Sequence, residues 1–227
     1  MSQLHGTALT PAYRNGGTSV FRRGSVRGLG SALVALCALT ALACGDERSP
    51  DVPGAPEESA EADPQLVFWA SLQDLCGRAF EGRLVESVPP DDSFEGQRLV
   101  MHVRECDVGE IRIPFYVGDD RSRTWVVTTT ATGLRLKHDH RHEDGSEDEI
   151  TQYGGDTPGQ GDPSAQEFHA DAHTAALIPA AATNVWTIEV HPDSVFAYAL
   201  RREGTDRRFR AEFDLTREVE EPPPPWQ

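Results

Sequence analysis

Residues 134–142 read LRLKHDHRH, and this stretch alternates strictly between two kinds of side chain. Successive side chains of a β-strand point to opposite faces, so Leu134, Leu136 and the three histidines share one face. The basic and acidic residues between them share the other. The leucines predict that their face is inward, where imidazoles are costly unless they are hydrogen-bonded or ligated. The stretch therefore predicts a strand that runs from the core of a β-protein into a polar site.

The same period of two recurs over most of the chain, between short turns rich in Gly, Pro and Asp. Short turns imply antiparallel hairpins, since no stretch between the strands could form a long crossover helix. We expect an all-β fold, an antiparallel up-and-down, calycin-like barrel of about 8 to 10 strands, with a two-sheet β-sandwich as the alternative. Asp63-Pro64 and Gly77 predict the start and end of one short N-terminal helix. The expected strands are 78–88, 99–104, 111–117, 123–130, 133–142, 147–153, 166–172, 184–191, 194–201 and 208–215.

The first 44 residues have the composition of an export signal. They hold four arginines and no acid, and the apolar run from Leu29 to Ala43 is too short to span a bilayer comfortably. The run ends in Ala41-Leu42-Ala43-Cys44, which resembles the lipobox of bacterial lipoproteins, where the chain is cut before a cysteine that carries the lipid. Residues 41–43 also fit an ordinary small-x-small export site at the same bond. The protein is thus expected to be exported, either as a lipoprotein anchored to a membrane at Cys44 and facing the periplasm or cell surface, or as a soluble periplasmic protein.

Composition divides the chain into four segments. Residues 1–44 are the expected signal peptide with its lipidation site, 45–63 an acidic, Pro-rich, disordered tether, 64–216 the barrel domain and 217–227 a disordered Pro-rich tail. The formal net charge is −16, and loss of the four arginines of the signal leaves −20. Such acidity argues against nucleic acid as a partner and is typical of a solvated surface.

Two of the four cysteines are available for a disulfide. Cys37 leaves with the signal and Cys44 is the lipidation candidate, which leaves Cys76 and Cys106. An exported chain meets an oxidising compartment, and two cysteines without a CxxC spacing make a poor zinc site. We therefore expect a disulfide between Cys76 and Cys106.

The polar end of residues 134–142 is the candidate site, and its neighbours depend on the register of the next hairpin. An even loop places Glu149 and Tyr153 on the histidine face, whereas an odd loop places Ile150 there. Both registers stay open. The first would give a ligand-binding site composed of His138, His140, His142, Glu149 and Tyr153.

Metal binding is one hypothesis for this site, because imidazole is a favoured ligand of zinc, copper and iron. Alternate side chains on a strand lie about 6.6 Å apart, which sets His138 and His142 about 13 Å apart, too far to share one ion easily. The predicted metal ligands are therefore His138 and His140 with Glu149 or Tyr153. Two alternatives stay open: a hydrogen-bonded polar network at the barrel end, and an organic ligand, haem included.

Three functions fit these features. A membrane-tethered binding protein would hold a small ligand or metal ion at the His-rich strand. An enzyme would use the same histidine, glutamate and tyrosine groups for acid/base or metal-assisted chemistry, and an envelope interaction module would have no pocket. The sequence holds no nucleophile elbow, phosphate loop or dinucleotide fingerprint, so it assigns no catalytic residue.

Four stretches carry a resemblance to known sequences: residues 75–77 (LCG), 112–115 (RIPF), 136–145 (LKHDHRHEDG) and 151–155 (TQYGG). They are similar to an uncharacterised family of bacterial secreted proteins and lipoproteins, over about residues 75–215. The resemblance implies export and a single domain. It implies no activity and no site residues.

Overall fold

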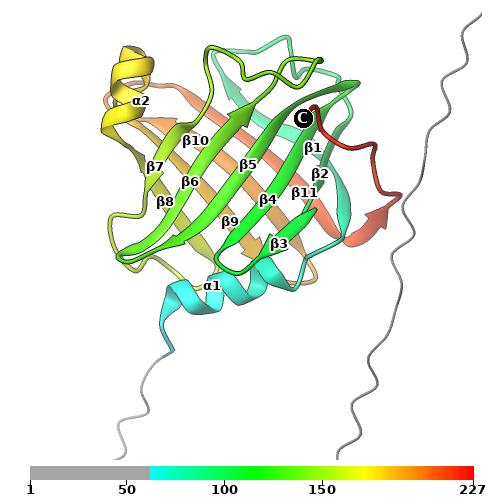
Figure 1. Cartoon of the computed structure of the whole chain (residues 1–227), viewed down its shortest axis with the longest axis horizontal. Coiled ribbons are helices and arrows are strands. Elements are labelled where there is room, and N and C mark those ends of the chain that lie inside the picture. The colour runs from blue at the N-terminus through cyan, green and yellow to red at the C-terminus, as the bar shows by residue number, and fades with distance from the viewer. Residues whose placement is uncertain (1–61) are drawn as a thin grey trace, which may run out of the picture. The chain divides into compact units, whose positions relative to one another are not determined.

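The computed structural model describes residues 62–227, so the expected signal peptide, Cys44 and most of the expected tether lie outside the described residues. The described part is mostly β-structure (Figure 1). Its helices are α1 (Pro64–Gln73) and α2 (Ala172–Leu177), followed by a 3-10 turn (Pro179–Ala181), and neither helix is long and apolar enough to cross a membrane. Its strands are β1 (Ala79–Val88), β2 (Leu99–His102), β3 (Glu105–Asp107), β4 (Glu110–Val117), β5 (Asp120–Thr130), β6 (Gly133–His140), β7 (Tyr153–Asp156), β8 (Ala165–Ala170), β9 (Asn184–His191), β10 (Val195–Arg202) and β11 (Arg208–Val219).

Ten of these strands form a closed antiparallel barrel. Strands β4 to β11 pair in chain order, β11 pairs with β1, β1 pairs with β2, and β2 pairs with β4 to close the ring. The short strand β3 lies beside β4 as an extra strand. The predicted up-and-down, calycin-like barrel with a short N-terminal helix is therefore confirmed, and the alternative of two separate sheets is wrong.

Alternation places one set of side chains inside the barrel along each strand. On β9 the interior residues Trp186, Ile188 and Val190 are almost fully buried, and on β6 so are Leu134 and Leu136. All five belong to one continuous apolar core. The period of two that predicts the strands is thus the period with which the chain fills its interior.

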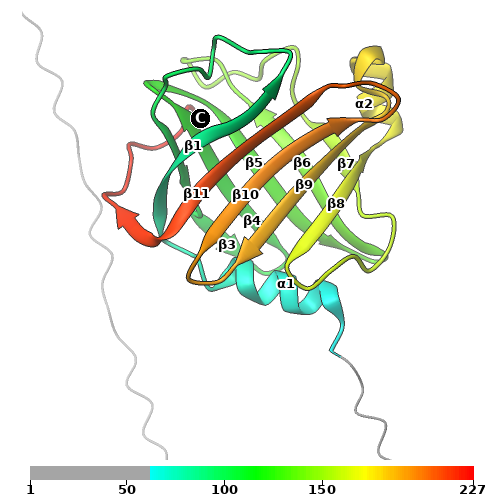
Figure 2. The same cartoon turned by 180° about the vertical axis from the view of Figure 1, so that it is seen from behind.

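Helix α1 covers one end of the barrel, which we call the closed end; it lies below the strands in both views (Figures 1 and 2). The helix begins where Asp63 Oδ1 accepts a hydrogen bond of 2.9 Å from the Gln65 N–H, which satisfies one free donor of the first turn. Phe68 and Leu72 are 0 % exposed and join the core. The helix contacts β8 and β9, so the N-terminal segment completes the barrel interior.

The predicted disulfide between Cys76 and Cys106 is confirmed. It joins the segment after α1 to β3, with the two Cα atoms 6.2 Å apart and 30 residues apart in sequence. The covalent link therefore fastens the helix that covers the closed end to the barrel wall.

The expected strand 147–153 is wrong, because these residues form a loop and β7 begins only at Tyr153. Asp148 Oδ1 accepts a hydrogen bond of 2.8 Å from the Ile150 N–H, which bends the chain into a turn. Gln152 has a φ of 57°, in the left-handed region that an extended strand does not use. Strand pairing can therefore resume only after Gln152.

The expected strand 99–104 is too long. Strand β2 ends at His102, and β3 follows as a separate strand that pairs with β4 but not with β1. Three residues are too few to show a period, so the sequence does not distinguish β3 from a turn.

The tail expected to be disordered, residues 217–227, is ordered in part as the end of β11 and in part along the outside of β4 and β5 (red in Figure 1). The Tyr116 hydroxyl donates to the Pro223 carbonyl at 3.0 Å, and Arg121 Nη1 donates to the Pro224 carbonyl at 3.1 Å. A Pro-rich segment makes no internal hydrogen bonds, so its carbonyls are free to accept from the barrel. The prediction of a disordered tail is therefore wrong.

Candidate functional site

The barrel interior is filled from the closed end to a layer of aromatic rings. In this layer Trp125 stacks on Tyr198 and on Phe115, with ring centroids 4.3 Å and 4.7 Å apart. At the opposite end, which we call the mouth, lies a pocket of about 400 Å³. Its lining comes from β5, β6, β7, β9, β10 and β11 and from the loops at that end, including the turn after α2. The mouth pocket is therefore assembled by the closure of the barrel.

The lining of the mouth pocket is rich in aromatic side chains. Trp186 and Tyr198 are 2 % and 8 % exposed and form its base, while Phe94, Tyr153 and Phe209 line its sides. Eight of the seventeen lining residues are polar or charged, namely Asp91, Ser93, Arg123, His140, Asp148, Asn184, Arg202 and Arg207. A small-molecule site combines apolar and aromatic contact area with polar groups that fix the orientation of a ligand, and this pocket offers both.

His138 does not line the pocket; it is 3 % exposed, and both of its ring nitrogens are hydrogen-bonded. Nδ1 lies 3.1 Å from the Tyr153 carbonyl oxygen, and Nε2 lies 2.7 Å from the Tyr198 hydroxyl. A carbonyl oxygen can only accept, so Nδ1 carries the proton and donates, and Nε2 accepts from the tyrosine hydroxyl. Burial lowers the pKa of His138 to about 3, so the ring is neutral.

The position of His138 bears on the metal hypothesis. A metal ion at Nε2 would displace the Tyr198 hydroxyl, a buried donor that would then lose its acceptor. The His138 ring also stacks on Tyr153 with centroids 4.5 Å apart, and so fixes one side of the pocket. At His138 the structure has a hydrogen-bonded polar network, which was one of the two alternatives to metal binding.

His140 and Tyr153 are the two predicted site residues that reach the mouth pocket, where the Tyr153 hydroxyl lies 3.1 Å from His140 Nε2. Burial lowers the pKa of His140, and the Arg123 charge acts in the same direction, while Asp148 opposes them. Burial raises the pKa of Tyr153 to about 12. Both side chains are therefore neutral near pH 7 and can exchange hydrogen bonds with a ligand.

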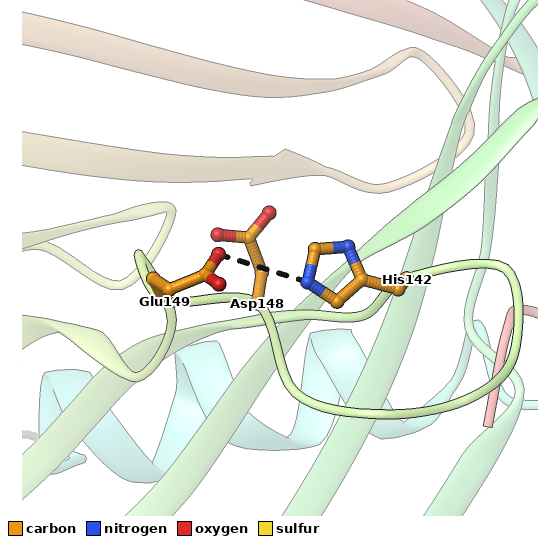
Figure 3. A group of neighbouring side chains, drawn as sticks. All are labelled: His142, Asp148 and Glu149. Atoms are coloured by element: carbon orange, nitrogen blue, oxygen red, sulfur yellow. Dashed lines mark ion pairs between the residues drawn. The ribbon is translucent and has the colours of Figure 1, made fainter.

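His142 and Glu149 lie outside the pocket, on the loop between β6 and β7 (Figure 3). His142 Nε2 is 3.7 Å from Glu149 Oε2, and Asp148 lies beside them, with one ligand atom from each residue within 4.8 Å of the others. The predicted metal set is thus divided. The structure brings Glu149 to His142, and it brings Tyr153 to His138 and His140.

No motif of the sequence marks the other residues of the pocket. The inward row of β10 runs Phe196, Tyr198, Leu200, Arg202, so the parity that assigns Leu200 to the interior also assigns Arg202 to it. This parity can be read from the sequence alone. The order of the strands around the ring, which decides what Arg202 faces, cannot.

The fold and the site define a closed β-barrel with a filled interior and an aromatic-lined pocket at one end. No protein-family model, no curated protein and no solved structure matches the chain. The function must therefore be argued from the pocket and its residues.

Proposed function

We propose that this protein is a binding protein that takes a small organic ligand into its mouth pocket. The observation that carries the proposal is the pocket itself, whose volume of about 400 Å³ lies in the range of small-molecule sites, about 300 to 1,000 Å³. Trp186, Tyr198 and Phe209 would supply apolar contact area. His140 and Tyr153 would supply hydrogen bonds that orient the ligand.

The side chains of the pocket are held in place, which favours a ligand-binding site over an unfilled space in the packing. His138 holds the Tyr153 backbone and the Tyr198 hydroxyl from beneath, and Trp125 stacks on the Tyr198 ring. Side chains fixed before a ligand arrives lose little conformational entropy when it binds.

A polarity-sensitive probe tests this proposal. The neutral dye N-phenyl-1-naphthylamine should fluoresce on binding to the wild-type barrel, and Leu200→Trp, which fills the pocket, should weaken binding about tenfold or more. The matched control is Val108→Trp, which adds the same side chain at a fully exposed position in the turn between β3 and β4. Equal binding by Leu200→Trp and the wild type, or no binding by the wild type of either this dye or its sulfonated analogue, would contradict the proposal.

A second candidate function is metal binding at the loop between β6 and β7. It is favoured by one imidazole and two carboxylates, those of His142, Asp148 and Glu149, whose ligand atoms lie within 4.8 Å of one another. Nitrogen and carboxylate oxygen ligands suit zinc. Calorimetric titration with zinc should show one site that His142→Ala abolishes. His191→Ala is the control, because His191 also lies near a glutamate, at 3.6 Å from Glu189, but belongs to no three-residue cluster among residues 62–227. Equal zinc binding by both variants would contradict this candidate.

We further propose that the protein is exported and anchored to a membrane through a lipid at Cys44. The sequence of residues 41–44 supports this, and a disulfide is compatible with an oxidising compartment. Cys44→Ala should move the protein from the membrane fraction to the soluble fraction of the cells. Retention of the variant in the membrane fraction would contradict lipidation.

A further inference from the structure

Two arginines line the mouth pocket at the hairpin between β10 and β11. Arg202 is the last residue of β10 and Arg207 directly precedes β11, and both line the pocket. Burial lowers the pKa of Arg202, and the nearby charge of Arg207 acts in the same direction. Two like charges are therefore held close together at the edge of an aromatic surface.

Neither arginine has a carboxylate oxygen within 4.0 Å among residues 62–227. Two outward-facing arginines of the same strands are paired, Arg201 with Glu167 at 3.0 Å and Arg210 with Glu189 at 2.7 Å. Four arginines among residues 62–227 have no carboxylate oxygen within 4.0 Å, namely Arg121, Arg202, Arg207 and Arg208, and of these Arg202 and Arg207 line the mouth pocket. Two of the four unpaired basic charges therefore lie together at this one pocket.

The hydrogen bonds of the two guanidinium groups are also incomplete. Arg202 Nε donates to Asn184 Oδ1 at 2.8 Å. Arg207 Nε is buried and has no hydrogen-bond partner in the described part of the chain. A buried donor without a partner is rare and costly, and it marks a place where an acceptor from outside the chain would be stabilised.

The other charged groups of the pocket make contacts of their own. Arg123 is paired with Asp120. The two acids, Asp91 and Asp148, accept from backbone N–H groups of their own loops, at 3.1 Å from Ser93 and 2.8 Å from Ile150. These hydrogen bonds leave the two carboxylates charged. Among the described residues, Arg202 and Arg207 are the cations of the lining without an acid partner, and Asp91 and Asp148 are its carboxylates without a basic partner.

We propose that the pocket takes an organic anion, with a carboxylate or sulfonate group bound by Arg202 and Arg207 and an apolar or aromatic body against Trp186, Tyr198 and Phe209. This inference rests on the proposed ligand site and adds the chemical class of the ligand. Guanidinium groups match such anions because they donate several hydrogen bonds in one plane. An anion between the two arginines also removes their mutual repulsion.

Two dyes with the same body test the inference on the whole folded domain. 1-Anilinonaphthalene-8-sulfonate differs from N-phenyl-1-naphthylamine by one sulfonate, so the ratio of their dissociation constants measures the contribution of the anion. The wild type should bind the sulfonate about tenfold or more tightly than the neutral dye, since hydrogen bonds to charged groups are worth at least one factor of ten. Added NaCl should weaken binding of the sulfonate and leave the neutral dye unaffected.

The double variant Arg202→Gln/Arg207→Gln should lose this preference and still bind the neutral dye. Arg208→Gln is the matched control, because Arg208 is on the same hairpin and likewise has no carboxylate within 4.0 Å among the described residues, but it does not line the pocket. If the wild type binds both dyes equally, or the double variant keeps the preference, the inference is overturned while the proposed site stands. If the wild type binds neither dye, both are overturned. A double variant that does not fold leaves the salt dependence of the wild type as the decisive measurement, and salt-independent sulfonate binding overturns the inference.

Discussion

The two ends of the barrel use the same strands for different purposes. Along the inward row of β10, Phe196 is 0 % exposed and Tyr198 8 %, and the row continues through Leu200 to the half-buried Arg202 at the mouth. The closed end has α1, the disulfide and tightly packed apolar side chains. The mouth has a pocket, neutral hydrogen-bonding groups and unneutralised arginines. The difference teaches that stability is concentrated at one end of this barrel, which leaves the side chains at the other end free to serve recognition.

The largest expected effect is at the closed end. Phe68→Ala removes a 0 %-exposed ring from the junction of α1 with the core, and should lower the free energy of unfolding by about 3 to 5 kcal/mol. Leu66→Ala on the same helix is the control, because Leu66 is 69 % exposed. Urea denaturation measures both. A loss for Phe68→Ala no larger than that for Leu66→Ala would show that α1 does not stabilise the barrel.

The disulfide should contribute the next largest effect. Its loop of 30 residues predicts that the double variant Cys76→Ala/Cys106→Ala loses about 3 kcal/mol of stability. Because the link is at the closed end, binding of the neutral dye at the mouth should stay unchanged. Reductant should destabilise the wild type and leave the double variant unaffected. Loss of dye binding in a folded double variant would contradict the separation of the two ends.

The pH dependence of the free energy of unfolding should reveal the lowered pKa of His138. Its pKa is about 3 in the folded barrel and has the ordinary value of 6.5 when unfolded, so the unfolded chain binds more protons between these values. The stabilising contribution is complete above pH 6.5 and is lost as pH falls toward 3, with a slope of about 1.4 kcal/mol per pH unit. Denaturation between pH 4.5 and 6.5 measures it. His138→Gln should have a shallower slope, and the exposed-site control His191→Gln should not.

The smallest expected effect is at the rim of the mouth. Ile150 lines the pocket and is 43 % exposed, so Ile150→Ala should change the free energy of unfolding by less than about 0.5 kcal/mol. The same denaturation measurement applies, with Phe68→Ala as the contrast. A loss above 2 kcal/mol, the low end for buried apolar side chains, would show that the rim is part of the core.

Much of the fold can be predicted from the sequence because it depends on local periods. Leu134, Leu136 and His138 are interior, as alternation requires, and α1 begins at its Asp63 cap. The start of β7 cannot be predicted in this way, because a turn at Asp148 and the left-handed backbone at Gln152 interrupt an alternating sequence. Periodicity alone contains no information about such turns.

The candidate site can be predicted from the sequence only in part. Neither of the two open registers holds in full, because His138 faces Tyr153 as an even loop requires, whereas Ile150 and not Glu149 lines the pocket. The structure also adds partners that are distant in sequence. Tyr198 is 60 residues from His138, and Arg207 comes from yet another strand end. Which side chains meet at the mouth depends on closure of the ring, which no single stretch encodes.

Closure of the ring has a further consequence for the behaviour of the protein at high concentration. A sheet with an unpaired edge can template pairing with another chain and so begin aggregation. Among the described strands, β3 is the one that pairs on a single side, and it is three residues long. Cys106 fastens this strand to the segment after α1. Because β2 pairs with β4 and with residues 79–82 of β1, the unpaired edges of the described barrel are limited to β3 and to part of a strand, such as residues 83–88 of β1.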